Sequence, residues 1–237
     1  MMEQATNAPR VIRRHSVLTR VCHWINALCF FMLLMSGMQI FNAYPGLNWG
    51  QTTDFQHAFF WLDDGFPGWA TLPGIQDLAT GRRWHFFFAW LLVANGAVYF
   101  GELFLRRHIR DFIPDGHDWR HIPRAIIDHA RLRFPKGDEA LHYNVLQKLA
   151  YLAAILAFPV LILAGLTMSP GMDARFPWLL DLFGGRQSAR SIHFLLASFL
   201  VAFLIVHLAM VVLSGPINNI RSMITGRYRI EEEDHAA

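Results

Sequence analysis

Four long stretches of the chain contain no charged side chain. Asp, Glu, Lys and Arg are absent from residues 21–53, 84–101, 149–172 and 191–220. Each stretch has 18 residues or more, about the number that an α-helix needs to cross a hydrocarbon layer ~30 Å thick. The pattern predicts four membrane-spanning helices, at about residues 17–41, 84–105, 144–168 and 191–213. Because little chain is left over, we expect an all-α, membrane-embedded four-helix bundle in which residues 1–237 form one domain.

The composition supports this interpretation. Hydrophobic residues make up 54% of the 237 residues and charged residues only 16%, whereas an ordinary soluble domain is about 25% charged. This composition argues against a soluble globular protein and against a disordered chain. The net charge of +3 gives no reason to expect nucleic acid binding. Cys22 and Cys29 form neither a CxxC pair nor a haem-attachment motif, so we interpret them as small buried residues.

The basic residues predict the orientation of the helices. The first apolar stretch is too long for the apolar part of a signal peptide, so we interpret it as a retained helix. Of the 21 Lys and Arg residues, 16 fall in the N-terminal segment up to Arg20, in residues 106–148, or after the fourth helix. Only five fall in the other two connections. Since basic residues collect on the cytoplasmic side of a membrane, both termini are predicted to be cytoplasmic.

Two connections are longer than a minimal bundle needs. Residues 42–83, on the outer side, are rich in Trp, Phe, Gly, Pro and Asp and have room for a short helix on the membrane surface. On the inner side, residues 118–134 place apolar residues at helical spacing with arginines between them. This pattern predicts an amphipathic helix at the membrane interface, with a partly solvated loop helix as the alternative. The apolar residues are Trp119, Ile122, Ile126, Ala130 and Phe134.

Four of the twelve histidines fall within the predicted spans. Ionisable side chains at membrane depth are costly and usually face a partner inside the bundle. His23 and His207 each lie six residues from the cytoplasmic end of a span, which is ~9 Å at 1.5 Å per residue. His85 and His193 lie near the outer ends. The four therefore form two pairs at matched depths, His23 with His207 and His85 with His193.

The spacing within the fourth helix predicts chemistry. His193 and His207 are 14 residues apart, close to four full turns, so they point to nearly the same face about 21 Å apart. Two facing imidazoles in a helix bundle can bind a haem iron without a covalent link. Both open iron positions are then filled, so such a centre transfers electrons only. A proton relay, a metal transporter and packing without function remain alternatives.

Small and basic residues are compatible with the same interpretation. Small residues on the predicted helices would make room for a flat macrocycle, or would allow close helix packing instead. Arginines near the helix ends would pair with haem propionates, or anchor the helices at the interface. The small residues are Gly37, Gly96, Gly165, Ala197, Ser198 and Ala202, and the arginines are Arg20, Arg82, Arg83 and Arg190.

Three stretches resemble the bacterial cytochrome b561 and nickel–iron hydrogenase cytochrome b superfamily. They are RVCHWIN at 20–26, GRRWH at 81–85, and the two histidines of the fourth helix. The superfamily includes formate dehydrogenase gamma subunits and thiosulfate reductase cytochrome b subunits. The resemblance implies a bacterial inner-membrane protein with two haem b groups, one held by His23 and His207 near the cytoplasm and one by His85 and His193 near the periplasm. It also implies electron exchange with a quinone, either ubiquinone or menaquinone.

A fourth stretch, YNVLQK at 143–148, resembles the family's Asn-x-Gly-Gln-Lys segment at the start of the third helix. In formate dehydrogenase gamma subunits this asparagine contacts quinone beside the cytoplasmic-side haem. The resemblance implies that Asn144 donates a hydrogen bond to a quinone carbonyl, with Gln147 and Lys148 close by. Leu146 stands where the family has glycine. Alternatively, Asn144 lies near an N-cap position and only begins the helix.

Three functions follow from these features. The chain contains no flavin, molybdenum or iron–sulfur motif, so the first hypothesis is an electron-transfer subunit, rather than a catalytic one, between quinone and a periplasmic molybdenum enzyme or hydrogenase. Residues 42–83 would then be the docking surface. The second is a freestanding oxidoreductase of the cytochrome b561 type that passes electrons from a small diffusible donor, such as superoxide, to quinone. The third is a cofactor-free transporter or proton conductor that uses the same histidines.

Overall fold

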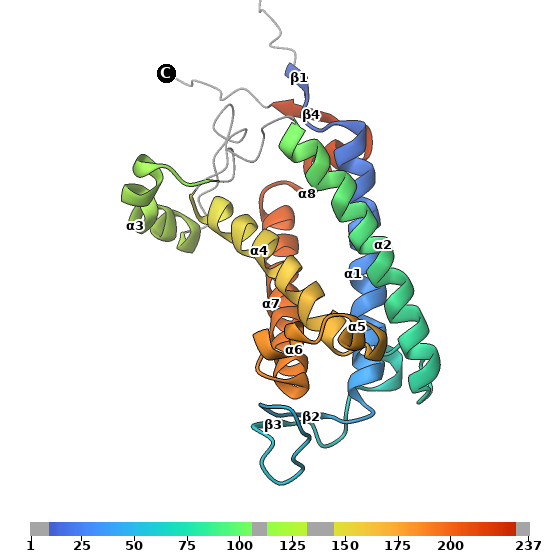
Figure 1. The fold of residues 1–237 in the computed structure, drawn as a ribbon. Helices are drawn as coiled ribbons and strands as arrows, with labels where there is room; N and C mark the ends of the chain where they lie inside the picture. The colour runs from blue at the N-terminus through green and yellow to red at the C-terminus, as the bar shows by residue number, and fades with distance from the viewer. Residues whose placement is uncertain (1–9, 106–112, 132–144, 231–237) are drawn as a thin grey trace, which may run out of the picture. The chain divides into compact units, whose positions relative to one another are not determined.

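Four long helices dominate the computed structural model, which describes residues 10–105, 113–131 and 145–230 (Figure 1). Each is long and apolar enough to cross a membrane. The chain is thus a multi-pass membrane protein, and the predicted four-helix fold is confirmed. The helices are α1 (Val17–Phe41), α2 (Leu78–Leu105), α4 (Val145–Thr167) and α7 (Arg186–Leu213).

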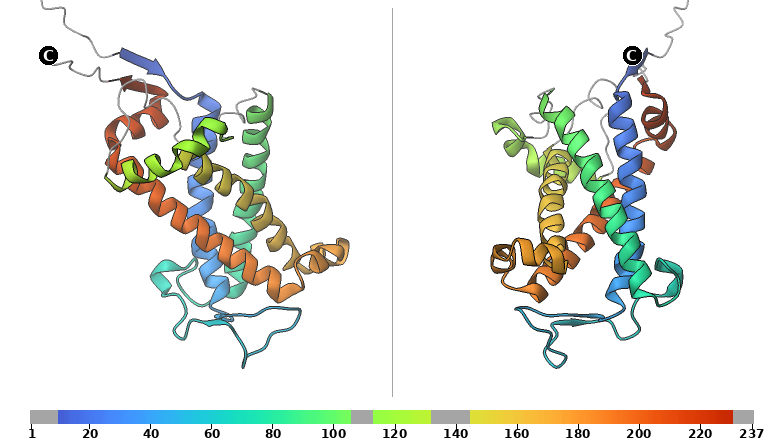
Figure 2. Two further views of the ribbon diagram at one scale, coloured as in Figure 1. Left: turned by 90° about the vertical axis from the view of Figure 1, so that its left-hand side faces the viewer. Right: turned by 45° about the vertical axis from the view of Figure 1, so that its right-hand side comes forward.

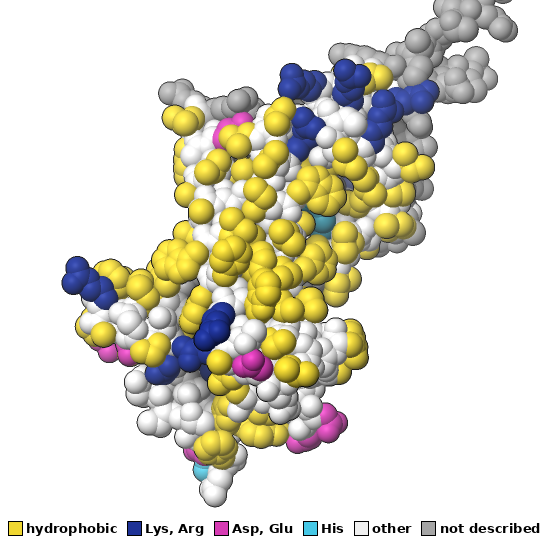
Figure 3. All heavy atoms as spheres, turned by 90° about the vertical axis from the view of Figure 1, so that its right-hand side faces the viewer, with side chains coloured by type: hydrophobic (Ala, Val, Ile, Leu, Met, Phe, Trp, Pro, Cys, Tyr) yellow, Lys and Arg dark blue, Asp and Glu magenta, His cyan; other side chains and the backbone are white. Residues whose placement is uncertain are grey.

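Large apolar side chains on these helices are exposed, in keeping with a lipid surrounding. Trp90, Val206 and Val212 are each about 60% exposed, and Figure 3 shows hydrophobic side chains spread over much of the face it presents. Cys22 and Cys29 are buried and form no disulfide, which agrees with their interpretation as small buried residues.

The chain divides into two compact units, and each long helix contributes a segment to both. One unit comprises residues 1–22, 99–153 and 203–237, and the other residues 23–98 and 154–202; they are called here the first and second unit. In the second unit, Cys29, Phe88 and Leu92 form a buried cluster between α1 and α2. The single domain expected for residues 1–237 stays a prediction.

Helix α2 begins before its predicted start at residue 84. The carboxylate of Asp77 accepts a hydrogen bond from the backbone N–H of Thr80 at 3.0 Å, which is the contact of an N-cap residue with the third helical residue. The cap allows the helix to start in a polar segment that includes Arg82 and Arg83. The prediction from uncharged stretches placed the helix start after these two arginines, and therefore too late.

Helix α7 also begins early, because a distant loop supplies acceptors for its first N–H groups. The N–H groups of Gln187 and Ser188 donate to the carbonyl of Gly50, at 3.0 and 3.1 Å, and that of Arg186 donates to Gln51 Oε1 at 3.0 Å. The N–H groups at a helix start have no partner inside the helix. A Cβ on Gly185, whose φ is +104°, would lie 2.6 Å from the Gly50 oxygen, so this close approach requires glycine.

The outer connection between α1 and α2 is irregular. In it β2 (Gly46–Leu47) pairs antiparallel with β3 (Phe60–Trp61), and η1 (Gly68–Ala70) is a single 3-10 turn. This turn is the one helical segment within residues 42–77, so the surface helix for which that stretch has room is not found there. Figure 2 shows from two sides that the loop with β2 and β3 lies at the start of α7. The second outer connection contains α5 (Pro170–Arg175) and α6 (Trp178–Leu182).

In the first unit, the two ends of the described chain meet. Strand β1 (Arg10–Arg13) pairs antiparallel with β4 (Arg227–Ile230), which follows α8 (Pro216–Thr225). Both ends therefore lie on the same side, as an even number of spans requires. Their cytoplasmic location is inferred from the basic residues around them.

The predicted amphipathic helix is α3 (Gly116–Ala130). Its Trp119, Ile126 and Ile127 side chains are about half exposed, so an apolar face is available to an interface. The predicted continuation over residues 132–134 lies outside the described residues. The placement of α3 at the membrane interface stays a prediction.

Candidate functional site

Two histidines from different helices lie together in the second unit. His85 of α2 and His193 of α7 have ring centroids 6.2 Å apart, with the ring planes at 61°. Each is about two turns into its helix. The depth estimate from the sequence predicted this pair, and the structure brings its members together.

The His85 ring is held by helix α1. Its Nδ1 lies 3.1 Å from the hydroxyl of Ser36, and the carbonyl of Leu33 is a second, backbone partner. Ser36 is fully buried. Since Ser36 engages Nδ1, the Nε2 nitrogen is left to act as a ligand.

The His193 ring is held in a similar way by helix α4. Its Nδ1 donates to the carbonyl of Leu161 at 2.8 Å. A peptide carbonyl can only accept a hydrogen bond, so Nδ1 carries the proton and Nε2 keeps its lone pair. Among the described residues, neither Nε2 atom of the pair has a hydrogen-bond partner.

Two glycines let these rings reach the helix backbones. A Cβ added to Gly37 would lie 3.4 Å from Cε1 of His85, and one added to Gly165 would lie 3.1 Å from Cε1 of His193. Each glycine is four residues after the carbonyl that its histidine contacts, Leu33 in α1 and Leu161 in α4, and so lies on the same helix face. The sequence suggested that these glycines make room for a macrocycle; in the structure they make room for the imidazoles.

The ligands that this pair offers fit a haem iron. Two imidazole nitrogens on opposite sides of one metal ion, at about 2.0–2.1 Å each, place the ring centroids roughly 6 Å apart. The observed separation is 6.2 Å. Within the described residues, no group of three or more His, Cys, Asp or Glu side chains gathers, whereas a zinc site made by protein alone needs three or four ligands. A porphyrin supplies the remaining ligands of its iron, so two imidazoles are sufficient.

Arg190 lies one turn before His193 and is bound to the outer loop. Its guanidinium donates to the carbonyls of Gly46, at 2.6 Å, and Tyr44. It also lies over the rings of Phe41 and Tyr44, 5.3 and 4.9 Å from their centroids. Because a guanidinium has five N–H donors, donors remain for an anion, and the contact of Arg190 with a haem propionate stays a prediction.

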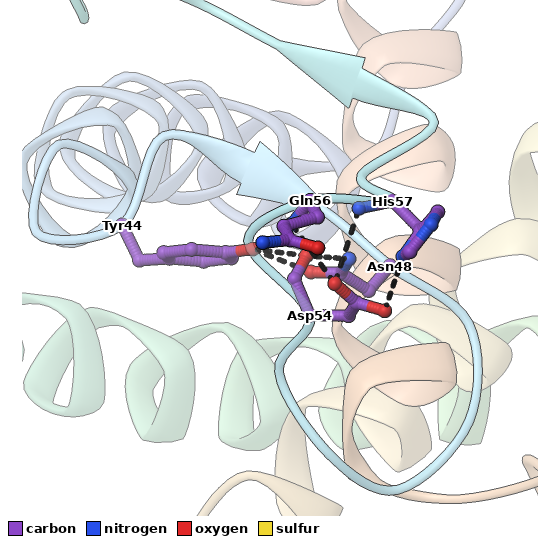
Figure 4. A network of polar contacts seen from close by, with 5 residues as sticks. All are labelled: Tyr44, Asn48, Asp54, Gln56 and His57. Atoms are coloured by element: carbon purple, nitrogen blue, oxygen red, sulfur yellow. Dashed lines mark hydrogen bonds and ion pairs between the residues drawn. The ribbon is translucent and has the colours of Figure 1, made fainter.

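The outer loop is tied to α7 beside His193. The hydroxyl of Ser191 donates to the carbonyl of Asn48 at 2.6 Å, and the N–H of Gly50 donates to the hydroxyl of Ser188 at 2.7 Å. Asn48 is itself held, since its side chain accepts from the Tyr44 hydroxyl at 2.6 Å and donates to a loop carbonyl (Figure 4). The helix that carries His193 is thus fixed at its start by contacts far apart in the sequence.

The other predicted propionate partners lie elsewhere. Arg83 is exposed on the first turns of α2, and its charge acts on Asp77. Arg82 lies 5.7 Å over the ring of Phe86. In the first unit, the Arg20 guanidinium donates to the carbonyls of Ser16, at 3.3 Å, and Ile224. Arg20 therefore ties α1 to α8, a role that the sequence did not indicate, and propionate binding by these three arginines stays a prediction.

The second predicted histidine pair falls in different units. His207 of the first unit stacks on Phe203, one turn earlier in α7, with centroids 6.1 Å apart and planes at 14°. His23 of the second unit has an edge-to-face contact with Trp24 at 5.4 Å. The pairing of His23 with His207 stays a prediction.

The predicted quinone residues lie at the start of α4. Asn144 falls outside the described residues, and Gln147 is half-buried. Lys148 forms an ion pair with Asp118 of α3 at 2.7 Å, and both side chains are less than one-fifth exposed. No sequence pattern indicated this pairing, because the two residues belong to separate predicted helices.

A buried amide pair is a further feature that the sequence did not reveal. Asn95 of α2 donates to the side-chain oxygen of Asn26 of α1 at 2.6 Å, and Asn95 is only 7% exposed. Amides hydrogen-bond across membrane helices and fix their packing. The signal available was a polar residue inside each predicted span.

Two comparisons place the chain among known proteins. Residues 14–226 match the family described as prokaryotic cytochrome b561. The chain is also 35% identical over 200 residues to the "putative protein-methionine-sulfoxide reductase subunit YedZ1" of Azospira oryzae, and the match covers 84% of this chain and 90% of that protein. The family match extends over all four long helices and both histidine pairs. The chain belongs to the prokaryotic cytochrome b561 family.

Proposed function

We propose that this chain is the di-haem membrane subunit of a bacterial inner-membrane oxidoreductase, and that it transfers electrons between the quinone pool and a periplasmic enzyme. The observation that carries the proposal is the His85–His193 pair, with a 6.2 Å ring separation and Nδ1 of each ring engaged by a neighbouring helix. Family membership supports b-type haem chemistry at such a pair. A haem held by both imidazoles would supply electron transfer rather than substrate chemistry.

The residues of the outer site have separate roles in this proposal. Nε2 of His85 and of His193 would hold a haem there, and a bound haem would supply one-electron chemistry. The Ser36 hydroxyl and the Leu161 carbonyl would accept hydrogen bonds from Nδ1–H of His85 and of His193, which leaves each Nε2 unprotonated. Arg190 fixes the outer loop above the pair through the carbonyls of Gly46 and Tyr44.

The inner site follows from the resemblance and from matched depth. His23 and His207 would hold a second haem near the cytoplasmic side, and Asn144, Gln147 and Lys148 would bind ubiquinone or menaquinone beside it. Quinol oxidation releases two electrons and two protons. Two haems at different depths would let the electrons reach the outer surface one at a time.

The partner is proposed to be a periplasmic reductase that acts on oxidised methionine residues in proteins. The support is the name of the Azospira relative, a putative protein-methionine-sulfoxide reductase subunit. Reduction of a sulfoxide consumes two electrons and two protons and yields a thioether and water, which balances one quinol oxidised to quinone. This proposal replaces the broader expectation of a molybdenum enzyme or hydrogenase with one kind of partner. It also implies a direction of electron flow, from quinol to the periplasm.

A spectroscopic experiment tests the haem assignment. The purified protein should contain two haems per chain by pyridine haemochrome assay and show a b-type reduced-minus-oxidised spectrum. His57, an exposed loop histidine paired with Asp54 at 2.8 Å, provides a control, because His57→Ala should keep both haems. A colourless protein, when made in cells supplied with haem, would overturn the proposal in favour of a cofactor-free transporter.

A second experiment separates a partnered subunit from a freestanding oxidoreductase. In proteoliposomes containing this protein, a quinol analogue should reduce both haems. An added periplasmic methionine sulfoxide reductase, supplied with methionine sulfoxide as the electron acceptor, should reoxidise them. Rapid electron transfer from superoxide to quinone by the protein alone, together with no reoxidation by the reductase, would favour the freestanding type.

A further inference from the structure

The single proton of the Ser36 hydroxyl already takes part in a hydrogen bond that does not involve His85. Ser36 Oγ donates to the carbonyl of Met32 at 2.6 Å, and the carbonyl of Leu33 lies farther away, at 3.3 Å. A hydroxyl has one donor and two acceptor lone pairs. The side of the oxygen that faces His85 can therefore only accept.

The hydrogen bond that Ser36 donates to Met32 determines which nitrogen of the His85 imidazole carries the proton. The Nδ1 atom of His85 lies 3.1 Å from the Ser36 oxygen, and with that oxygen acting as acceptor, Nδ1 must carry the proton. Nε2 is then the nitrogen with a lone pair, and it is the only one able to bind iron.

We propose that Ser36 is a positioning residue that fixes the tautomer and orientation of His85 and lowers the reduction potential of the outer haem. The proposal rests on the proposed function, because it assumes that His85 binds haem. A hydrogen bond accepted from the Nδ1–H of a ligating histidine makes the ring a more basic ligand. A more basic ligand stabilises ferric iron relative to ferrous iron.

The two halves of the outer pair differ in this respect. His193 meets a backbone carbonyl, which no substitution at that position removes. His85 meets a side-chain hydroxyl that a single substitution deletes. The potential of the outer haem is therefore adjustable at position 36 but not at the equivalent contact on α4.

The test is a redox titration of purified holoprotein carrying Ser36→Ala. We expect haem content to stay near two per chain, because the Leu33 carbonyl still supports the ring. The ferrous-to-ferric ratio of the outer haem, at a fixed ambient potential, should rise by up to about tenfold, the effect of one lost hydrogen bond. A tenfold change equals about 59 mV for a one-electron couple. The inner haem should titrate as in the wild type.

Two further variants separate positioning from general packing. Ser36→Thr keeps a hydroxyl able to donate one turn back and should restore the wild-type titration. Ser214→Ala deletes a hydroxyl that bonds in the same way, to the carbonyl of Met210 at 2.6 Å just after the end of α7, and should change neither haem. The proposal is wrong if Ser36→Ala titrates like the wild type, or if Ser214→Ala shifts the outer haem as much.

Electron paramagnetic resonance of the ferric protein gives a second readout. The g values of a low-spin haem depend on the orientation of its axial imidazoles, so Ser36→Ala should shift one of the two signals. His85→Ala identifies which signal belongs to the outer haem. If His85→Ala leaves both signals intact, the proposed function has failed; if it removes one that Ser36→Ala leaves unchanged in g value and potential, only the role of Ser36 has failed.

Discussion

The two ends of helix α7 carry similar histidines in different surroundings. His193, near the start, reaches across to the backbone of α4 beside Gly165 and lies next to His85. His207, near the end, stacks on the ring of Phe203 in its own helix. The register of the two histidines suggests two equivalent ligands. In their contacts they are distinct.

The difference shows what fixes a ligand before its cofactor binds. A hydrogen bond to a buried carbonyl specifies both ring orientation and tautomer. An aromatic contact specifies the plane of the ring but not which nitrogen is protonated. We therefore expect the outer site to be preorganised for haem. The following predictions test the two sites.

Loss of a ligating histidine should have the largest effect. His85→Ala and His193→Ala should each remove the same haem, and His23→Ala and His207→Ala should each remove the other, so that content falls from two haems to one. Redox titration and pyridine haemochrome assay measure this directly. A variant pair from one site that removes different haems would break the assignment of pairs by depth.

Adding a methyl group at Gly165 or at Gly37 should weaken haem binding at the outer site, and the effect should be larger at Gly165. In Gly165→Ala the new Cβ would lie 3.1 and 3.2 Å from Cε1 and Nδ1 of His193, whereas in Gly37→Ala the nearest atom of His85 would be at 3.4 Å. Gly165→Ala should therefore lose much of the outer haem during purification and Gly37→Ala less. Gly101→Ala on α2, where a Cβ meets nothing within 4 Å, is the matched control and should retain both haems.

The fold was largely predictable because membrane spans have a strong local signature. The predicted helix over residues 17–41 agrees with α1, and the predicted third helix agrees closely with α4. The starts of α2 and α7 were missed for a physical reason. Asp77 caps one helix and Gly50 the other, so both helices extend into polar sequence that a search for uncharged stretches excludes.

In the candidate site, only the features that follow from the geometry of a single helix could be predicted from the sequence. Depth and register placed His85 with His193, since both follow from a fixed rise and turn per residue. The residues that these two histidines contact on neighbouring helices could not be predicted in this way. Ser36 and Gly165 have no distinctive local pattern, and the contact of Lys148 with Asp118 joins residues in separate elements. Such contacts depend on how helices pack, which no local pattern specifies.

The Lys148–Asp118 ion pair gives a more moderate prediction at the inner site. If Lys148 donates to quinone as the resemblance implies, Lys148→Met should raise the KM for a quinol analogue by about tenfold, the value of one charged hydrogen bond. Asp118→Asn, which keeps the lysine, should leave KM within about twofold of the wild type, since an amide oxygen can still accept from it. Equal increases in both variants would mean that the pair only anchors α3 on α4.

The buried amide pair should contribute less. Asn95→Leu removes the hydrogen bond to Asn26 and leaves its partner without that donor, at a cost of about 0.5–1.5 kcal/mol in the free energy of unfolding, by comparison with other polar pairs in membranes. Thermal or denaturant unfolding in detergent measures the loss. Asn26 and Asn95 both belong to the second unit, so the outer haem should become easier to remove. An unchanged unfolding free energy would contradict a packing role.

The smallest effect should come from the cap at the start of α2, which supports the helix of His85. The hydrogen bonds from the hydroxyl and backbone N–H of Thr80 lower the pKa of Asp77 below its ordinary value of 3.8. A carboxylate whose pKa is lowered on folding stabilises the folded state fully above the unfolded pKa and loses that contribution as pH falls through the folded pKa. Between pH 5 and pH 3 the outer haem should therefore become slightly easier to remove. Asp77→Asn, which caps without a charge, should reduce this pH dependence, and an unchanged dependence in that variant would rule out the cap as its source.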